Sequence, residues 1–180
     1  MPSLPDLREL HRRHFGITEA LCVAYAEAAA VCLSRNHTSP LDVSIIAADR
    51  PIASYSLEWF QPSGREVGAW ANRVDAIEAA AYSLALAAVE VTFQLTAFGR
   101  TETNTGADYY IGRREDDFET AYRLEISGVG RGPLSALRDR LNRKIRQARR
   151  GVSRLPAMAC VVGLEAATIM IAMAVTDDRP

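Results

Sequence analysis

The sequence has little of what marks a secreted protein. Its three cysteines are an odd number without a CxxC pair, which argues against a disulfide framework and suits a reducing compartment. The first residues lack the basic segment and the apolar run of a signal peptide, because prolines and acids interrupt them: Pro2, Pro5, Asp6 and Glu9. We therefore expect a cytoplasmic protein.

The sequence also lacks an uninterrupted apolar run of membrane-spanning length. The nearest candidate, residues 156–175, has the 20 residues that a spanning helix needs. It carries Glu165 near its middle, where a charge is costly in hydrocarbon, and a break at Gly163. We interpret this stretch as two buried strands and expect no membrane association.

Lysine is almost absent, since Lys144 is the only lysine among the 21 basic residues. The net charge of -1 hides a local excess, because residues 131–154 contain eight arginines and Lys144 against one acid, Asp139. Such a patch binds phosphate groups, although a solvated helix face has the same composition. The candidate nucleic-acid contacts are the following arginines: Arg131, Arg138, Arg140, Arg143, Arg146 and Arg149.

A chain of 180 residues with 48% hydrophobic composition is large enough for one domain with its own core. We expect a single domain over residues 1–180, in which an N-terminal layer (1–66) precedes a core (72–175). Thr18 and Asn72 are typical N-cap residues and mark helix starts. The elements predicted for the N-terminal layer are helices over residues 4–14 and 18–34, a β-hairpin over 41–48 and 52–60, and a loop over 61–66.

The core is predicted to contain a helix, three strands, an arginine-rich helix and two strands. This order indicates an α/β (α+β) fold with a central mixed sheet flanked by helices. Two strands carry one acid each among apolar and aromatic residues, namely Asp108 and Glu125. The predicted ranges are a helix from 72 to about 89, strands over 89–98, 107–112 and 121–128, a helix over 133–150, and strands over 157–163 and 167–175.

At Asp108 and Glu125 this arrangement resembles the PD-(D/E)XK, or restriction-endonuclease-like, nuclease superfamily. The core of that superfamily is αβββαβ: a helix, a three-stranded antiparallel meander, a helix and a returning strand. The resemblance covers about residues 72–163 and implies that the two acids bind a divalent metal. The strings Thr105–Gly112 and Arg123–Gly128 also resemble an uncharacterised bacterial protein family, which implies no activity.

The residue types suit this chemistry for physical reasons. A hard cation such as Mg²⁺ takes one or two carboxylates together with water and phosphate oxygens, so acids on adjacent strands suffice. The bound ion lowers the pKa of an attacking water and stabilises charge on the scissile phosphate. We therefore expect Mg²⁺ or Mn²⁺ as the cofactor and nucleic acid as the partner.

Ser127 stands where the superfamily has its lysine, on the same strand face as Glu125. In some members the lysine lies on the following helix, and Lys144 resembles such a case, with Arg138 at the opposite edge of the apolar stripe. Glu78 resembles an acid that several members carry on the first core helix. The resemblance thus implies metal ligands at Asp108, Glu125 and Glu78 and a catalytic set of Glu78, Asp108, Glu125, Ser127 and Lys144.

Three functions remain open at this point. They are a metal-dependent nuclease, a nucleic-acid-binding module that has lost catalysis, as Ser127 permits, and a protein-interaction or immunity-type partner. Structural interpretations also exist: Asp108 shapes a turn, Glu125 pairs with Arg123 or with an arginine of the predicted helix, and Lys144 lies at a helix edge. The alanine-rich helix over 18–34 either packs on the core or forms a homodimer contact.

Two histidines, His11 and His14, share one helix face at i, i+3 spacing. A metal site needs a third ligand at a recognisable spacing, and none follows. We interpret both histidines as surface residues.

Overall fold

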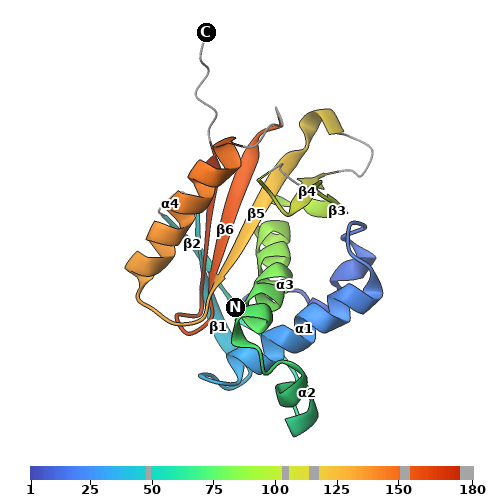
Figure 1. The fold of residues 1–180 in the computed structure, drawn as a ribbon, viewed down its shortest axis with the longest axis vertical. Helices are drawn as coiled ribbons and strands as arrows, with labels where there is room; N and C mark the ends of the chain where they lie inside the picture. Colours follow the sequence, from blue (N-terminus) through green and yellow to red (C-terminus); the bar gives the residue numbers. More distant parts are fainter. Residues whose placement is uncertain (48–49, 103–105, 114–117, 151–154, 175–180) are drawn as a thin grey trace.

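The computed structural model describes residues 1–47, 50–102, 106–113, 118–150 and 155–174. These residues form a mixed seven-stranded sheet, with strand order β2-β1-β7-β6-β5-β4-β3, flanked by helices (Figure 1). The predicted class, α+β with a central mixed sheet, is therefore confirmed. The elements, with η for 3-10 helices, are η1 (Leu7–Arg12), α1 (Glu19–Leu33), β1 (Leu41–Ala47), β2 (Arg50–Leu57), α2 (Gly64–Ala69), α3 (Arg73–Phe93), β3 (Thr96–Arg100), β4 (Tyr109–Gly112), η2 (Phe118–Thr120), β5 (Tyr122–Val129), α4 (Leu134–Arg150), β6 (Ala157–Gly163) and β7 (Thr168–Ala174).

The predicted hairpin forms one end of this sheet. Strands β1 and β2 pair antiparallel, from Leu41↔Leu57 to Ala47↔Arg50, and β1 also runs parallel to β7. The N-terminal layer and the core thus contribute strands to the same sheet. The predicted turn between β1 and β2 includes residues 48 and 49, which lie outside the described residues.

The strands of the core follow the predicted order. Strands β3, β4 and β5 form an antiparallel meander, β6 returns parallel to β5, and β7 pairs antiparallel with β6. Strand β6 has the predicted bounds, and α4 begins one residue after Pro133. From Arg73 onward the chain therefore reads as a helix, three strands, a helix and two strands, as the sequence predicts.

The two faces of the sheet are covered by different helices, and β6 is buried on both of them. Its residues Ala159 and Val161 pack with Leu137 and Leu141 of α4. The alternate residues of β6 belong to the larger core cluster that contains α3 and α1, because successive strand side chains point to opposite faces. In Figure 1, α4 accordingly lies on one side of the sheet and α3 and α1 lie on the other.

Helix α3 is the central helix of the fold. Its N-cap Asn72 accepts a hydrogen bond from the Val74 N–H (3.1 Å), as the sequence predicts. The helix is buried from Ala79 to Val89 between the sheet and α1. It continues to Phe93, so the strand predicted from residue 89 begins only at Thr96. Its length and apolar composition would suit a membrane-crossing helix, but 67% of its most apolar window is buried inside the fold.

The predicted loop over residues 61–66 is wrong in its second half, where α2 begins. Ser63 is the N-cap of α2, and its backbone N–H donates to the Glu66 side chain (2.7 Å) in a capping box. The serine and the glutamate three residues later were the sequence signal for this helix.

The N-terminal segment occupies backbone groups on both edges of the sheet. The Leu4 N–H donates to the Ser56 carbonyl on β2 (2.8 Å), and the Gly16 N–H donates to the Ala97 carbonyl on β3 (2.9 Å). Occupied backbone groups make an edge strand a poorer template for pairing with another chain.

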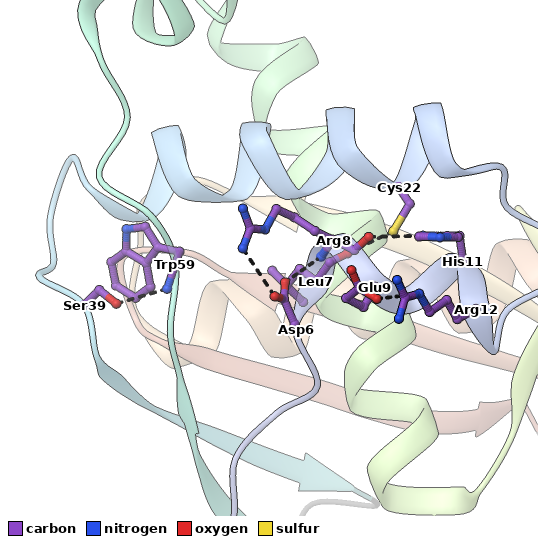
Figure 2. Close-up of polar contacts among 9 residues, drawn as sticks. All are labelled: Asp6, Leu7, Arg8, Glu9, His11, Arg12, Cys22, Ser39 and Trp59. Atoms are coloured by element: carbon purple, nitrogen blue, oxygen red, sulfur yellow. Dashed lines mark hydrogen bonds and ion pairs between the residues drawn. The ribbon is translucent and has the colours of Figure 1, made fainter.

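Between these two points, the segment packs against α1 through polar contacts (Figure 2). The Asp6 carboxylate caps η1 by accepting the Arg8 N–H (2.9 Å), and the Cys22 thiol donates to the Leu7 carbonyl (3.0 Å). These contacts fix η1 along the outer side of α1.

The prediction that His14 lies on the surface is wrong, because its side chain is fully buried. Its Nδ1 accepts the Ala97 N–H (3.0 Å), so the ring proton is on Nε2, which donates to Glu90 (3.0 Å). Arg13 donates to the other Glu90 oxygen (2.6 Å). Burial alone would raise the pKa of Glu90, but the hydrogen bonds from His14 and Arg13 and the Arg13 charge lower it.

Candidate functional site

A pocket of about 510 Å³ opens between α3, the end of β5, the glycine-rich loop that follows, and α4. All five residues predicted for catalysis line it, together with two of the six predicted nucleic-acid contacts. These side chains come from segments far apart in sequence, so only the fold brings them together. The predicted residues in the pocket are Glu78, Asp108, Glu125, Ser127, Arg131, Arg140 and Lys144.

The sequence predicts a strand over residues 107–112, which includes Asp108. In the structure, Asp108 lies one residue before β4. The pairing of β4 with β5 ends at Tyr109↔Leu124, and the Asp108 N–H donates to the Leu124 carbonyl (2.8 Å). The Asp108 side chain contacts Tyr82 of α3, whereas the Glu125 side chain contacts Lys144 of α4, so each acid is bonded to a different one of the two helices that border the pocket.

Both oxygens of the Asp108 carboxylate are held by hydrogen bonds. Oδ2 accepts the backbone N–H of Ile126 (2.7 Å), and Oδ1 accepts the hydroxyl of Tyr82 (3.1 Å). Burial raises the pKa of Asp108, although these hydrogen bonds and the nearby charges of Arg100 and Lys144 oppose the increase. The carboxylate is thus oriented, and each oxygen keeps a second lone pair for another partner.

Glu125 is buried on β5, with a side chain that is 5% exposed, and it forms an ion pair with Lys144. Burial raises the pKa of Glu125, and the negative charges of Asp108 and Glu78 add to this increase, while Lys144 opposes it. Lys144 also donates to the Gln147 side chain (3.3 Å). The single lysine of the chain therefore reaches inward from α4, as predicted, and touches one of the two strand acids.

Glu78 lies at the exposed side of the pocket, on the second turn of α3. Its Oε1 accepts a hydrogen bond from Tyr82 on the next turn (3.0 Å). Tyr82 thereby links Glu78 to Asp108, whereas Lys144 contacts Glu125. Of the three predicted metal ligands, Glu78 and Asp108 are therefore linked through Tyr82, and Glu125 is paired with Lys144.

Ser127 and the glycines after it form the floor of the pocket beside α3. A Cβ atom on Gly128 would lie 2.6 Å from the Ile77 carbonyl oxygen, so only glycine permits the observed approach of β5 to α3. Because Ile77 precedes Glu78, this approach brings Glu78 to the strand acids. Ser127 is partly buried and carries no positive charge, so it does not replace the lysine expected at its position.

The basic residues of α4 divide into two groups. Arg140 is half-buried and lines the pocket, one helical turn before Lys144. Arg138, predicted at the inward edge of the helix, is exposed instead, because the sheet strands that α4 covers leave that edge to solvent. The other exposed arginines of α4 are Arg143, Arg146 and Arg149.

Arg131 lies in the loop before α4 and is exposed as well. Its guanidinium is 3.9 Å from Glu165, which also accepts the Gly132 N–H (3.2 Å). The side chain of Arg150 and the whole of Arg154, which belong to the same basic stretch, lie outside the described residues.

The side chains of the pocket offer a hard divalent cation only a small number of protein ligands. Within the described ranges of the chain, no group of three His, Cys, Asp or Glu residues is arranged to hold a metal. Mg²⁺ needs one or two carboxylates and completes its shell with water and phosphate oxygens. Asp108 and Glu125 line the same pocket and offer two carboxylates, whereas Glu78 is linked to Asp108 through Tyr82.

Sequence reasoning missed three residues around the site. Tyr82 lies four positions after Glu78 and therefore on the same face of α3, which was the available signal. Arg100 lies over the rings of Tyr82 and Tyr109, at 4.9 Å and 4.7 Å from their centroids, and lowers the pKa of Asp108 by its charge. No spacing in the sequence predicts that contact.

Arg123 is the third missed residue and is 2% exposed on β5. Its guanidinium donates to the carbonyl oxygens of Leu155 (3.1 Å) and Ala148 (3.2 Å). It therefore binds carbonyl groups near the C-terminal end of α4, not Glu125, which was one of the pairings considered from the sequence.

Comparisons of the chain with protein-family models, with curated proteins and with solved structures found no match. The function is therefore argued from the pocket itself.

Proposed function

We propose that this chain is a metal-dependent, nuclease-like protein that acts on nucleic-acid phosphodiesters. The observation that carries the proposal is the pocket that Glu78 of α3, Asp108 just before β4 and Glu125 of β5 line together with Lys144 and Arg140 of α4. Adjacent negative and positive groups are what a metal-bound phosphate requires, because the acids hold the cation and the bases contact the phosphate.

The roles follow from the contacts of each side chain. Asp108 and Glu125 would hold Mg²⁺ or Mn²⁺, which would polarise the phosphate and activate water. Lys144 and Arg140 supply positive charge near the phosphate oxygens. Glu78 assists from the rim of the pocket, and the exposed arginines of α4 bind the nucleic-acid backbone.

The order of elements gives a second line of support. Helix α3, the β3-β4-β5 meander, α4 and β6 follow one another as in the restriction-endonuclease-like core that the sequence resembles. In that resemblance the acids belong to the second and third core strands, which here are β4, whose first residue follows Asp108, and β5. We infer this fold type on those grounds.

Cleavage assays test the proposal. The protein is incubated with single-stranded and double-stranded DNA and with RNA, in Mg²⁺, in Mn²⁺ and in EDTA. We expect cleavage that requires the metal and falls at least 100-fold in Asp108→Asn and in Glu125→Gln, since each variant loses a ligand charge. Asp139→Asn, an exposed acid on α4, is the matched control. Metal-dependent cleavage that survives both site substitutions would contradict the assignment.

A second function is favoured by two observations. Ser127 carries no charge at the lysine position, and Lys144 already neutralises Glu125. Both suit a nucleic-acid-binding module without catalysis. Such a module binds nucleic acid equally well with EDTA, and its affinity falls steeply with salt because exposed arginines release counterions.

Binding titrations separate the two functions. Fluorescence anisotropy with labelled oligonucleotides is measured at several salt concentrations for the wild type and for Arg143→Gln and Arg146→Gln. For each lost phosphate contact, the slope of log affinity against log salt should decrease by about one. Arg65→Gln, on the distant helix α2, is the control. If no nucleic acid binds at low salt, both nucleic-acid functions are wrong.

A further inference from the structure

Tyr82 is held in the pocket by its aromatic surroundings and not by the acids that it contacts. Its ring lies 5.1 Å from that of Tyr25 and 5.8 Å, edge to face, from that of Tyr109. The guanidinium of Arg100 covers the ring at 4.9 Å, and the residue is 8% exposed. The position of the hydroxyl is therefore fixed before any ligand arrives.

That hydroxyl lies between two carboxylates. It is 3.0 Å from Oε1 of Glu78 and 3.1 Å from Oδ1 of Asp108. A phenol has one proton and donates to one acceptor at a time, so at any moment one of the two carboxylates lacks this hydrogen bond. The hydroxyl therefore restrains Asp108, a proposed metal ligand, and links it to Glu78 at the rim of the pocket.

We propose that Tyr82 is the positioning residue of the cation site, orienting the Asp108 carboxylate as a ligand of a divalent ion and linking it to Glu78. This inference rests on the proposed metal-dependent function. The Ile126 N–H fixes the other oxygen of Asp108 (2.7 Å), so Tyr82 completes the restraint on that carboxylate. Partners of this kind orient metal ligands, and their loss typically lowers metal affinity 10–100-fold.

The test measures metal affinity without catalysis. Mn²⁺ is titrated into the full chain, and the free ion is followed by electron paramagnetic resonance. Tyr82→Phe keeps the ring and its contacts with Tyr25, Tyr109 and Arg100 and removes only the hydroxyl. We expect its Mn²⁺ affinity to fall by about tenfold or more. Tyr122→Phe, on the same strand as Glu125 but away from the pocket, should bind like the wild type.

A double-mutant comparison tests whether Tyr82 acts through Glu78. Glu78→Gln alone should weaken Mn²⁺ binding, and Tyr82→Phe combined with Glu78→Gln should lose less than the product of the two single effects, because contacting residues are coupled. Circular dichroism confirms that each variant is folded at the titration temperature, and a purely structural role would change the unfolding midpoint without changing Mn²⁺ affinity.

The outcomes separate this inference from the proposed function. If the wild type binds Mn²⁺ and Tyr82→Phe binds it equally well, the positioning role is wrong while the metal site stands. If the wild type does not bind Mn²⁺ at millimolar concentrations, both the metal site and the role of Tyr82 are wrong. Weakened binding in Tyr122→Phe as well would also overturn the inference, because the effect would then not belong to the Tyr82 hydroxyl.

Discussion

Replacing Lys144 by methionine removes the positive partner of a carboxylate that has almost no contact with water. Methionine keeps the apolar length of the lysine stem against α4, so the change isolates the charge. The side chains of Lys144 and Glu125 are 19% and 5% exposed. In the variant, Glu125 is left as an unpaired buried charge, which destabilises a fold strongly.

The size of the loss can be bounded, because the unpaired carboxyl escapes by taking up a proton. A buried ion pair roughly balances its own desolvation, so the lone carboxyl determines the change. Protonating a group with an ordinary pKa of about 4.3 costs about 3.7 kcal/mol at pH 7 and about 1 kcal/mol at pH 5. Since Glu125 is nearly fully desolvated, we expect a loss of about 2–3.5 kcal/mol at pH 7.

Urea unfolding followed by circular dichroism at pH 5 and pH 7 measures this loss. Arg143→Met, an exposed cation one residue earlier on α4, is the matched control and should change stability by less than about 0.5 kcal/mol. The double variant Lys144→Met, Glu125→Gln should recover most of the loss, because no charge remains to be buried. A loss that is equal at the two pH values, or a double variant as unstable as the single one, would refute the reasoning.

Three further predictions concern stability and use the same unfolding measurements. Gly128→Ala should destabilise the protein by about 1–3 kcal/mol, because its Cβ would meet the backbone of α3, whereas Gly64→Ala, with nothing within 4 Å, should not. His14→Ala should cost about 2–4 kcal/mol, because it leaves one oxygen of Glu90 and the Ala97 N–H without their partner; nitrogen chemical shifts of the wild type should show the ring proton on Nε2 and not on Nδ1. The pKa of Asp108 is raised in the folded protein, so folding favours the protonated carboxyl, and its contribution to stability is present at low pH and is lost as pH rises through the folded pKa. The stability of Asp108→Asn relative to the wild type should therefore increase from acidic to neutral pH. A constant difference between the two proteins would contradict this.

The regular elements of the fold are largely predictable from local chemistry. Helix α1 begins after its cap Thr18, and α3 begins after Asn72, because a side-chain oxygen accepts the first free N–H groups. Strand β6 is an apolar run of strand length bounded by Pro156 and Gly163, so its bounds agree with the prediction. These signals lie within a few residues of each element and need no knowledge of its neighbours.

The parts that were wrong or missed depend on contacts between distant segments. Burial of His14 requires β3 and α3 to supply an N–H and a carboxylate, which lie 83 and 76 residues further along the chain. The inward direction of Arg140 rather than Arg138 depends on which strands α4 covers. The hydroxyl of Tyr82 contacts Asp108 only because the fold brings together two residues that lie 26 positions apart in the sequence. Hydrophobic periodicity does not predict such partners, because it reports which face of a helix or strand is apolar and not which residues cover that face.

The α4-facing side of β5 carries Arg123, Glu125 and Ser127 in succession, where a core strand would ordinarily place apolar side chains. The two charged residues are buried, and each is satisfied by α4: Arg123 by the Ala148 carbonyl and Glu125 by Lys144. Apolar residues of similar size would give equal or greater stability at such positions. The two contacts fix the register of α4, since a shift of one helical turn would break both at once.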